Sequence, residues 1–341
     1  MEDSYLKYCR GFIDVYMKKQ RKLSSNTIKS YRITLNQFLD YLIQEKNIPI
    51  LQVKIDHVNY ENVCSYLDWL QEEHKCTATT RNQKLMALRT FAKYCSLSGL
   101  EYICIHTDIQ KIPIQKTKGK LVDFLSEEAM ECLLSMPDMR HHYGMRNGCF
   151  MILMYDTAAR CQEMLDIKLS DIKHEKESYF VRLHGKGDKE RAVPVMKKTM
   201  EHIQRYMQFY HPEVTRCGDD YLFYTFSHGE RHQMSPDTVA RFIDKYSRAA
   251  HQVNPIVPEH VHPHQFRHTR AIHLYRSGTP LTLLSDYLGH AKMDTTQIYA
   301  YASPEMKAEA IQKANHPENT PAVSLWSSDD ETIKRLYGLI K

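Results

Sequence analysis

Residues 262–275 read HPHQFRHTRAIHLY, and this stretch sets the architecture of the second half of the chain. Proline is favoured in the first turn of a helix, so a helix is predicted to begin near Pro263. On that helix His264 and Arg267 are three residues apart and project from one face. An imidazole beside a guanidinium can transfer a proton and stabilise negative charge, which is the chemistry that a reacting phosphate requires.

A zinc site is the alternative for this histidine-rich stretch. His260, His262, His264 and His268 are close together in the sequence, and imidazole is a common zinc ligand. However, no HExxH motif occurs, and no Asp, Glu or Cys lies among these histidines to complete a typical catalytic set. The sequence therefore favours a site without a metal, and we expect no cofactor.

Clear helix boundaries follow on the C-terminal side. A helix is predicted to begin at Thr279 and to end where Gly289 supplies a left-handed residue, so His290 lies just past a helix end. Asp294 resembles the first residue of a capping box, and the helix that it begins carries Tyr299 in its first turns. His290 and Tyr299 are then close enough to face one site. Alone, a tyrosine is more often a half-buried amphipathic side chain than a nucleophile.

A further arginine lies upstream, in residues 155–165, YDTAARCQEML. Arg160 sits in an apolar stretch of helical type, where a guanidinium is costly to bury without an anionic partner. Glu163, three residues on, can supply that partner and hold the arginine in place. A purely structural Arg–Glu pair fits the same pattern, and the sequence alone leaves both interpretations open.

A glycine-flanked lysine lies in residues 183–195, LHGKGDKERAVPV. Short strands are predicted at Ser178–Leu183 and Arg191–Val195, joined across a polar turn. Lys186 lies at the tip of this hairpin, where its ammonium group could protonate a leaving oxygen. The alternative is an ordinary solvated turn lysine. Lys189 and Arg191 are candidate phosphate contacts or, alternatively, surface charges.

Length and charge indicate two domains. A chain of 341 residues is long for one domain, and residues 1–122 carry 19 Lys and Arg against 12 Asp and Glu, whereas the remainder carries 27 against 29. Helical spacing of apolar residues predicts an all-helical domain over residues 1–107, whose basic charge suits a polyanion. We expect a basic linker over 108–122, a mainly helical domain with a small β-sheet over 123–315, and a tail over 316–341.

The cysteines and the hydrophobic pattern bear on the cellular compartment. Nine cysteines without a CxxC pair argue against a disulfide framework and a zinc ribbon, and we expect reduced thiols. The N-terminus is charged throughout, unlike a signal peptide, and no apolar run approaches the roughly 20 residues that would span a bilayer. We therefore expect a cytoplasmic protein without a membrane partner.

Taken together, these segments resemble the tyrosine site-specific recombinase, or phage integrase, family, particularly its Xer-like and mobile-element members. TAAR with Glu163 resembles the family's first arginine segment, HGKGDKERAVPV its lysine hairpin, HPHQFRHT its His-x-x-Arg helix, YLGH its Leu-Gly-His segment and TTQIYAYAS its nucleophile motif. All five occur in family order, and the resemblance covers nearly the whole chain. Ala158-Ala159 and Ala300-Tyr301 depart from the frequent Gly-Leu and Thr-His. Tyr301 adds a second hydroxyl, but on a helix it points about 200° away from Tyr299.

The resemblance implies a mechanism in which Tyr299 attacks a DNA phosphate and leaves a 3′-phosphotyrosyl link and a free 5′ hydroxyl, without ATP or a metal. It assigns Arg160, Arg267 and His290 to stabilising the phosphorane, Lys186 to protonating the departing oxygen, His264 to helping to take the tyrosine proton, and Glu163 to orienting the first arginine. The implied outcome is strand exchange through a Holliday junction. This would serve integration, excision or transposition of a mobile element, or resolution of DNA.

The resemblance also implies partners and shape. A core-binding, SAM-like helical domain and an α+β catalytic domain would form a C-shaped clamp around double-stranded DNA with an inverted-repeat core site. The protein would act as a homotetramer, or together with related recombinases, on the nucleoid of a bacterium. Charged or hydroxyl-bearing residues at polar positions of the N-terminal helices are the candidate DNA contacts, with a merely solvated face as the alternative: Lys29, Arg32, Thr79, Arg81, Lys84 and Arg89.

The tail ends in an amphipathic segment, residues 324–341, SLWSSDDETIKRLYGLIK. In the family such tails dock on a neighbouring protomer, and we expect the same here, with packing on its own domain as the alternative. Two other functions compete with recombination. One is a DNA-binding accessory of the same fold without chemistry, and the other is a zinc-dependent phosphohydrolase that uses the histidine cluster.

Overall fold

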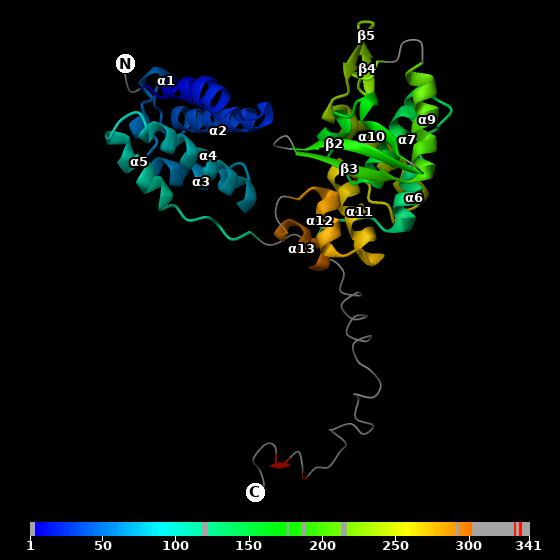
Figure 1. Cartoon of the computed structure of the whole chain (residues 1–341). Helices are drawn as coiled ribbons and strands as arrows, with labels where there is room; N and C mark the ends of the chain where they lie inside the picture. The colour runs from blue at the N-terminus through cyan, green and yellow to red at the C-terminus, as the bar shows by residue number, and fades with distance from the viewer. Residues whose placement is uncertain are drawn as a thin grey trace. The chain divides into compact units, whose positions relative to one another are not determined.

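The computed structural model describes residues 4–117, 122–175, 177–185, 189–212, 217–290 and 293–301, and the isolated residues 331, 334 and 335. The chain divides into two compact units, Met1–Lys120 and Leu121–Lys341, each with its own hydrophobic core (Figure 1). The division falls inside the segment predicted as a linker. The predicted tail over 316–341 lies outside the described residues except for the three isolated positions.

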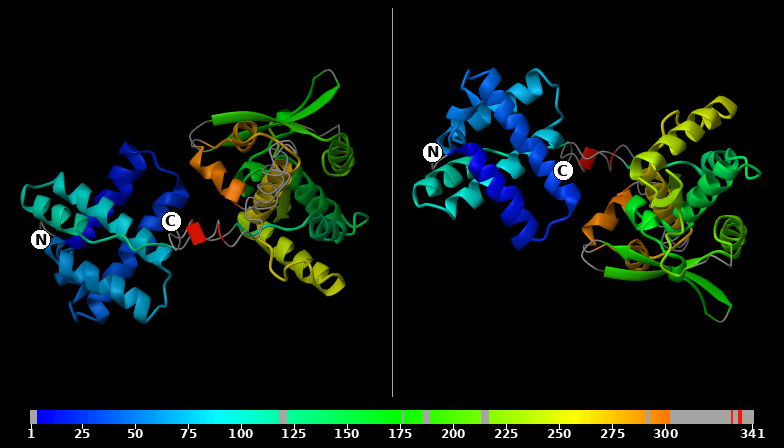
Figure 2. Two further views of the ribbon diagram at one scale, coloured as in Figure 1. Left: turned by 90° about the horizontal axis from the view of Figure 1, so that it is seen from below. Right: turned by 90° about the horizontal axis from the view of Figure 1, so that it is seen from above.

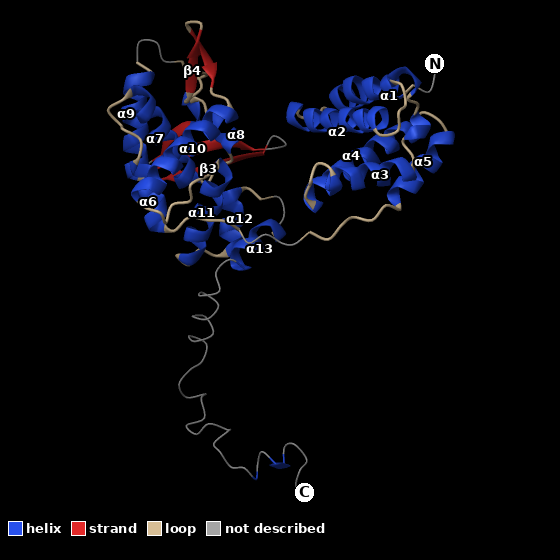
Figure 3. Ribbon diagram, turned by 180° about the vertical axis from the view of Figure 1, so that it is seen from behind, coloured by secondary structure: helices blue, strands red, loops and turns tan. Residues whose placement is uncertain are grey.

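The first unit contains only helices over its described residues (Figures 1 and 3). Its elements are α1 (Tyr5–Arg10), the π-helix η1 (Gly11–Gln20), α2 (Ser25–Gln44), the short η2 (Ile50–Gln52) and η3 (Ile55–His57), α3 (Tyr60–Glu72), α4 (Ala78–Ser96) and α5 (Glu101–Gln110). The side chains of Ser24, Asn59 and Thr77 accept hydrogen bonds from backbone N–H groups in the first turns of α2, α3 and α4. Each cap satisfies an N–H group that has no partner within its helix.

Aromatic side chains fill the core of this unit. The rings of Phe12 and Phe91 meet edge to face with centroids 5.3 Å apart, and those of Phe38 and Tyr66 do the same at 5.2 Å. The buried hydroxyl of Tyr5 donates to the carbonyl oxygen of Leu35 at 2.9 Å. Edge-to-face pairs add specificity to the apolar burial.

The chain that leaves α5 is held on α4 and α3 by side-chain hydrogen bonds. Arg89 donates to the carbonyl oxygens of Ile109, Gln110 and Ile112, so it caps the C-terminal end of α5. Asn82 exchanges two hydrogen bonds with the backbone of Gln115, through its Nδ2 at 2.8 Å and its Oδ1 at 3.1 Å. We call residues 109–115 the strap. The first residues of the linker predicted over 108–122 are therefore helical or bound to the first unit.

The second unit combines helices with two small antiparallel sheets (Figure 3). Its elements are α6 (Glu127–Ser135), α7 (His142–Thr157), α8 (Cys161–Leu165), η4 (Leu169–Asp171), β1 (Ile172–Glu175), β2 (Ser178–Gly185), β3 (Lys189–Val195), α9 (Lys197–Tyr210), β4 (Tyr224–Ser227), β5 (Glu230–Gln233), α10 (Pro236–Val253), α11 (Pro263–Arg276), α12 (Leu281–Leu288) and α13 (Asp294–Tyr301). The starts of α11 and α13, and the end of α12 at Gly289, agree with the sequence prediction.

Strands β1, β2 and β3 form one sheet in that order, and β4 pairs with β5. The ladder between β2 and β3 continues through the pair His184–Glu190 to Gly185–Lys189. The hairpin is therefore two residues longer on each side than predicted. Sequence patterning missed these residues because they are polar and lie beyond the apolar alternation.

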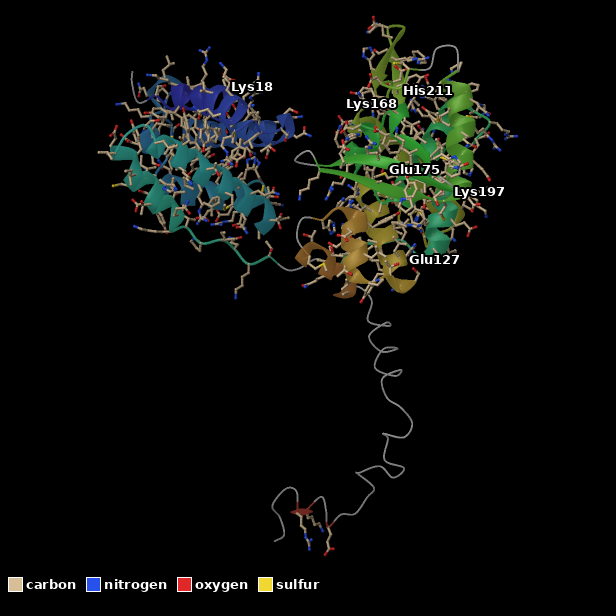
Figure 4. The ribbon with its side chains drawn as sticks, viewed as in Figure 1. Lys18, Glu127, Lys168, Glu175, Lys197 and His211 are labelled. Atoms are coloured by element: carbon tan, nitrogen blue, oxygen red, sulfur yellow. The ribbon has the colours of Figure 1, made fainter. Side chains whose placement is uncertain are left out.

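Helix α7 is the central element of the unit, since most of its side chains are buried. It packs against α9, α11 and β3, and the chain leaves it through Ala158, which has a left-handed φ of 49°. Side chains at the surface, such as Lys197 at the start of α9 and Lys18 in the first unit, reach into solvent (Figure 4). Over the described residues, none of the helices combines the length and the apolar character that crossing a membrane would need.

Candidate active site

Helices α11, α12 and α13 pack on one another at one end of the second unit (Figures 1 and 2). Their contacts enclose a small apolar cluster that includes Ala158, Ile272, Leu288 and Tyr299. This cluster places α13 against the face of α11 that carries the charged residues. Five residues from the sequence prediction meet here: Arg160, His264, Arg267, His290 and Tyr299.

Arg267 forms the buried floor of this region, with only 1% of its surface exposed. Its Nη1 donates to the carbonyl oxygen of Ala158 at 2.8 Å and its Nη2 to that of Leu288 at 2.6 Å. These carbonyls close α7 and α12, so one guanidinium binds the negative ends of two helices. Burial and then the nearby Arg160 lower the pKa of Arg267 to about 10, and the side chain stays charged at neutral pH.

Glu163 links two arginines at the edge of the site. It accepts hydrogen bonds from the backbone N–H of Arg160 at 2.9 Å and from its Nη1 at 2.6 Å. It also accepts two from Arg191, at 3.1 and 2.8 Å. Burial would raise the pKa of Glu163, but the hydrogen bonds from Arg191 and Arg160 outweigh it and lower the pKa to about 2. The carboxylate is therefore ionised and fixes both guanidinium groups.

Tyr299 lies inside the site and is almost fully buried, with 1% of its surface exposed. Its hydroxyl is 3.0 Å from Nδ1 of His268 on α11. Burial raises the pKa of Tyr299, and the charges of Arg267 and Arg160 oppose that shift. His264 lies one turn before His268, and the two imidazole rings pack edge to face with centroids 4.3 Å apart.

His290 also lies against the tyrosine ring. The two rings are nearly parallel, at 11°, with centroids 6.5 Å apart. Nδ1 of His290 is 2.8 Å from the hydroxyl oxygen of Thr296, a hydrogen bond that joins the end of α12 to α13. Burial, followed by Arg267 and Arg160, lowers the pKa of His290 to about 4, so the imidazole is neutral at neutral pH.

A cavity of about 400 Å³ opens beside Arg160, Arg191 and His290. The side chains and backbone that line it are Arg160, Gly185, Lys189, Glu190, Arg191, Asp286, Gly289 and His290. Gly289 is needed at this wall because its φ is +63° and because a Cβ atom there would come within 3.0 Å of the Arg191 guanidinium. A larger hollow of about 880 Å³ in the first unit is lined mainly by acidic and aromatic side chains, which do not suit a phosphate.

Lys186 lies outside the described residues, so its predicted role stays a prediction. The nearest described residues before and after it, Gly185 and Lys189, line the cavity. Among the described residues no group of three or more His, Cys, Asp or Glu side chains is arranged to hold a metal ion. His260, one of the histidines of the possible zinc site, instead contacts Asp244, with its Nδ1 2.8 Å from Oδ1 of the carboxylate.

The candidate DNA contacts of the first unit fall into two groups. Lys29, Arg32 and Thr79 are exposed on α2 and α4, and Lys84 is partly buried, which lowers its pKa. These four stay predictions. The other two need correction: Arg81 is 5% exposed and donates to the carbonyl oxygen of Pro113, and Arg89 caps α5. Both guanidinium groups donate hydrogen bonds to backbone oxygens of the strap, so both have partners within the protein.

Two residues of this region have contacts that the sequence does not predict. Arg191, a candidate phosphate contact or surface charge, has a side chain that is only 13% exposed and is paired with Glu163, so it is not a surface charge. A signal existed, because Arg191 alternates with Val193 and Val195, which face the core. His268, which the sequence suggests only as a zinc ligand, follows Arg267 and shares a helix face with His264.

Comparisons with known proteins identify the family of this chain. The phage integrase family matches residues 123–306, and the family's N-terminal SAM-like domain matches residues 12–97. Tyrosine recombinase XerC from Chlamydia caviae is 28% identical over 323 residues, which cover 91% of this chain and 98% of XerC.

Two solved structures share the fold. The XerH site-specific recombinase bound to a palindromic difH substrate aligns with a TM-score of 0.63 and 21% identity, over 86% of this chain and 82% of XerH. A lambda integrase tetramer bound to a Holliday junction aligns with a TM-score of 0.63 and 15% identity, over 87% of this chain and 76% of the integrase. At these identities the structures establish likeness of fold.

Proposed function

This chain belongs to the phage integrase family, and on that premise we propose that it is a site-specific DNA recombinase whose nucleophile is Tyr299. One observation carries the choice of nucleophile. The hydroxyl of Tyr299 lies 3.0 Å from an imidazole of α11, the helix that also supplies the buried cation Arg267. A tyrosine hydroxyl next to fixed positive charge can attack a phosphorus atom whose developing negative charge is stabilised.

In the proposed reaction the phenolic oxygen of Tyr299 bonds to the scissile phosphorus as the bond to the 5′ oxygen breaks. The product is a 3′-phosphotyrosyl link and a free 5′ hydroxyl. The link conserves the energy of the phosphodiester, so the reaction needs neither ATP nor a metal. A 5′ hydroxyl from a second DNA then reverses the step and exchanges the strands.

Each remaining residue has a proposed task. Arg160, Arg267 and His290 stabilise the phosphorane, since Arg160 and His290 line the cavity and the charges of Arg267 and Arg160 act on Tyr299. Glu163 and Arg191 fix the direction of Arg160 through the hydrogen bonds described above. Lys186 protonates the departing 5′ oxygen, and this assignment rests on the family resemblance together with the position of Gly185 and Lys189 at the cavity.

We also propose the assembly in which this chemistry takes place. Two pairs of protomers, identical or mixed with related recombinases, bind inverted-repeat core sites and exchange strands through a Holliday junction. Each protomer closes its helical domain and its catalytic domain around the duplex as a clamp. The palindromic substrate of XerH and the tetramer of lambda integrase support this arrangement by analogy. We expect it on the bacterial nucleoid, in integration, excision, transposition or resolution.

A trapping experiment tests the function. The target is first mapped by sequencing DNA fragments that the purified protein selects, and the mapped site is then placed in a duplex with a nick beside the scissile phosphate. The wild-type protein is expected to form a covalent adduct on this suicide substrate. Tyr299→Phe should form none, and the matched control Tyr301→Phe should keep it.

Other outcomes would identify the competing functions. Specific binding without any adduct would indicate a DNA-binding accessory. Cleavage that is lost in EDTA, together with stoichiometric zinc in elemental analysis, would indicate a metal-dependent phosphohydrolase.

A further inference from the structure

The hydroxyl of Tyr299 lies against a histidine that has no part in the mechanism above. Nδ1 of His268 is 3.0 Å from this hydroxyl, and the two rings lie with centroids 5.7 Å apart. His264 is the histidine that the family resemblance assigns to the tyrosine proton. Among the described residues it packs on His268 and makes no hydrogen bond to Tyr299.

We propose that His268 orients Tyr299 and receives its phenolic proton when the tyrosine attacks the DNA phosphate. This inference rests on the proposed function. As the bond from the phenolic oxygen to phosphorus forms, the proton passes from that oxygen to Nδ1 of His268. The imidazole becomes imidazolium, and the departing 5′ oxygen takes its proton from a different acid, for which Lys186 is the proposed source.

The surroundings of His268 keep it in the form that can accept a proton. Burial, followed by the nearby His264 and Arg267, lowers its pKa to about 4, so the ring is neutral near pH 7. His264 and Arg267 face it from its own helix and His262 from the residue before that helix, while Asp123 opposes them from the start of the unit. A DNA phosphate bound at Arg267 adds negative charge, which raises the pKa of the imidazole towards the pH at which a base acts best.

Tyr299 is also in the protonation state that this step requires. Because burial raises the pKa of Tyr299, the phenol is protonated at neutral pH and donates its hydrogen to the neutral nitrogen of His268. This donor–acceptor pair fixes the direction of the phenolic oxygen before DNA binds. It requires that the imidazole proton sit on the other ring nitrogen, Nε2.

Two substitutions of His268 separate its roles. Asparagine places an amide near the position of Nδ1, so His268→Asn keeps a hydrogen-bonding group but cannot take a proton, and His268→Leu keeps neither. His260→Asn is the matched control, because His260 is exposed and bound to Asp244. Single-turnover cleavage is measured for the full-length variants on the nicked duplex carrying the mapped site, between pH 5 and 9, together with DNA affinity and thermal unfolding.

We expect His268→Asn to cleave about 10²-fold more slowly than wild type, and His268→Leu more slowly still, with DNA affinity within about threefold. The wild-type rate should fall in acid as the imidazole is protonated, and this dependence should be absent in His268→Asn. A 5′-bridging phosphorothiolate, whose leaving group needs no proton, should not restore the rate of His268→Asn.

Several results would overturn the inference. If His268→Asn or a folded His268→Leu cleaved within threefold of wild type, His268 would have no such role. If the phosphorothiolate restored the rate of His268→Asn, the histidine would act on the leaving group instead. Both cases leave the recombinase assignment intact, whereas failure of the wild-type protein to form any adduct on its mapped site would overturn both proposals.

Discussion

Replacing Glu163 with glutamine tests how the two edge arginines are held. The carboxylate is 3% exposed and accepts four hydrogen bonds from Arg160 and Arg191. Its pKa falls from 4.5 to about 2 on folding. A shift of that size corresponds to about 3 kcal/mol of folding free energy at pH 7, since each unit of pKa is about 1.4 kcal/mol. Glu163→Gln should lose about this amount, because the two guanidinium groups are left without their counterion.

The pH dependence gives the sharper test. A carboxylate whose pKa is lowered in the folded protein contributes its full stabilisation above the unfolded pKa and loses it as the pH falls through the folded pKa. The difference between wild type and Glu163→Gln should therefore be about 3 kcal/mol at pH 7 and about 1 kcal/mol at pH 3. Urea unfolding of the full-length proteins, followed by circular dichroism, measures both values.

The control is Glu190→Gln. Glu190 lies on β3, directly before Arg191. Its side chain is 52% exposed and pairs with His184. Its substitution should change the unfolding free energy by less than about 0.5 kcal/mol, because exposed ion pairs contribute little. A loss below 1 kcal/mol for Glu163→Gln at pH 7, or a loss equal at pH 7 and pH 3, would refute the reasoning from the buried carboxylate.

Three further predictions concern the glycine of the cavity, the strap and a neutral histidine. Gly289→Ala should lower the unfolding free energy by about 1–2 kcal/mol, because its φ of +63° disfavours a side chain and the added methyl group meets Arg191; an unchanged urea midpoint would contradict this. Asn82→Ala should lower the local opening free energy at Gln115 by about 2 kcal/mol through two lost hydrogen bonds, measured by amide hydrogen exchange; unchanged protection would contradict it. His290→Gln should make stability less sensitive to acid between pH 6.5 and 4, since a lowered histidine pKa costs stability as pH falls through this range; parallel acid-unfolding curves would exclude the effect.

Local signals in the sequence predicted much of the fold because they act over one helical turn. Pro263 needs no N–H partner in the first turn of α11, and Gly289 adopts the left-handed conformation that ends α12. Neither of these depends on the rest of the chain. The ends of the strands were harder to predict from the sequence. The outer pairs of the hairpin, such as Gly185–Lys189, are polar, and their pairing is set by the register of the two strands.

Tertiary contacts account for what the sequence did not reveal. Arg89 has the same charge as an exposed DNA contact, but the carbonyls at the end of α5 lie within its reach, and that depends on how α5 packs on α4. The contact between His268 and Tyr299 likewise exists only because α13 docks on α11. The pair Arg160–Glu163, by contrast, spans one turn and was visible in the spacing, although Arg191 as its third member was not.

The chemistry proposed for this site also explains how it could stay inactive without DNA. Burial raises the pKa of Tyr299 and lowers that of His268, so in the protein alone the proton is held firmly on the tyrosine. The same burial leaves the phenol without access to water or to stray phosphate groups. A scissile phosphate bound beside Arg267 adds negative charge that raises the pKa of the imidazole, which burial and then His264 and Arg267 lower, and it provides the electrophile at the same time. On this proposal, binding of the DNA phosphate also activates the nucleophile, because the negative charge of the phosphate makes His268 a stronger base for the proton of Tyr299.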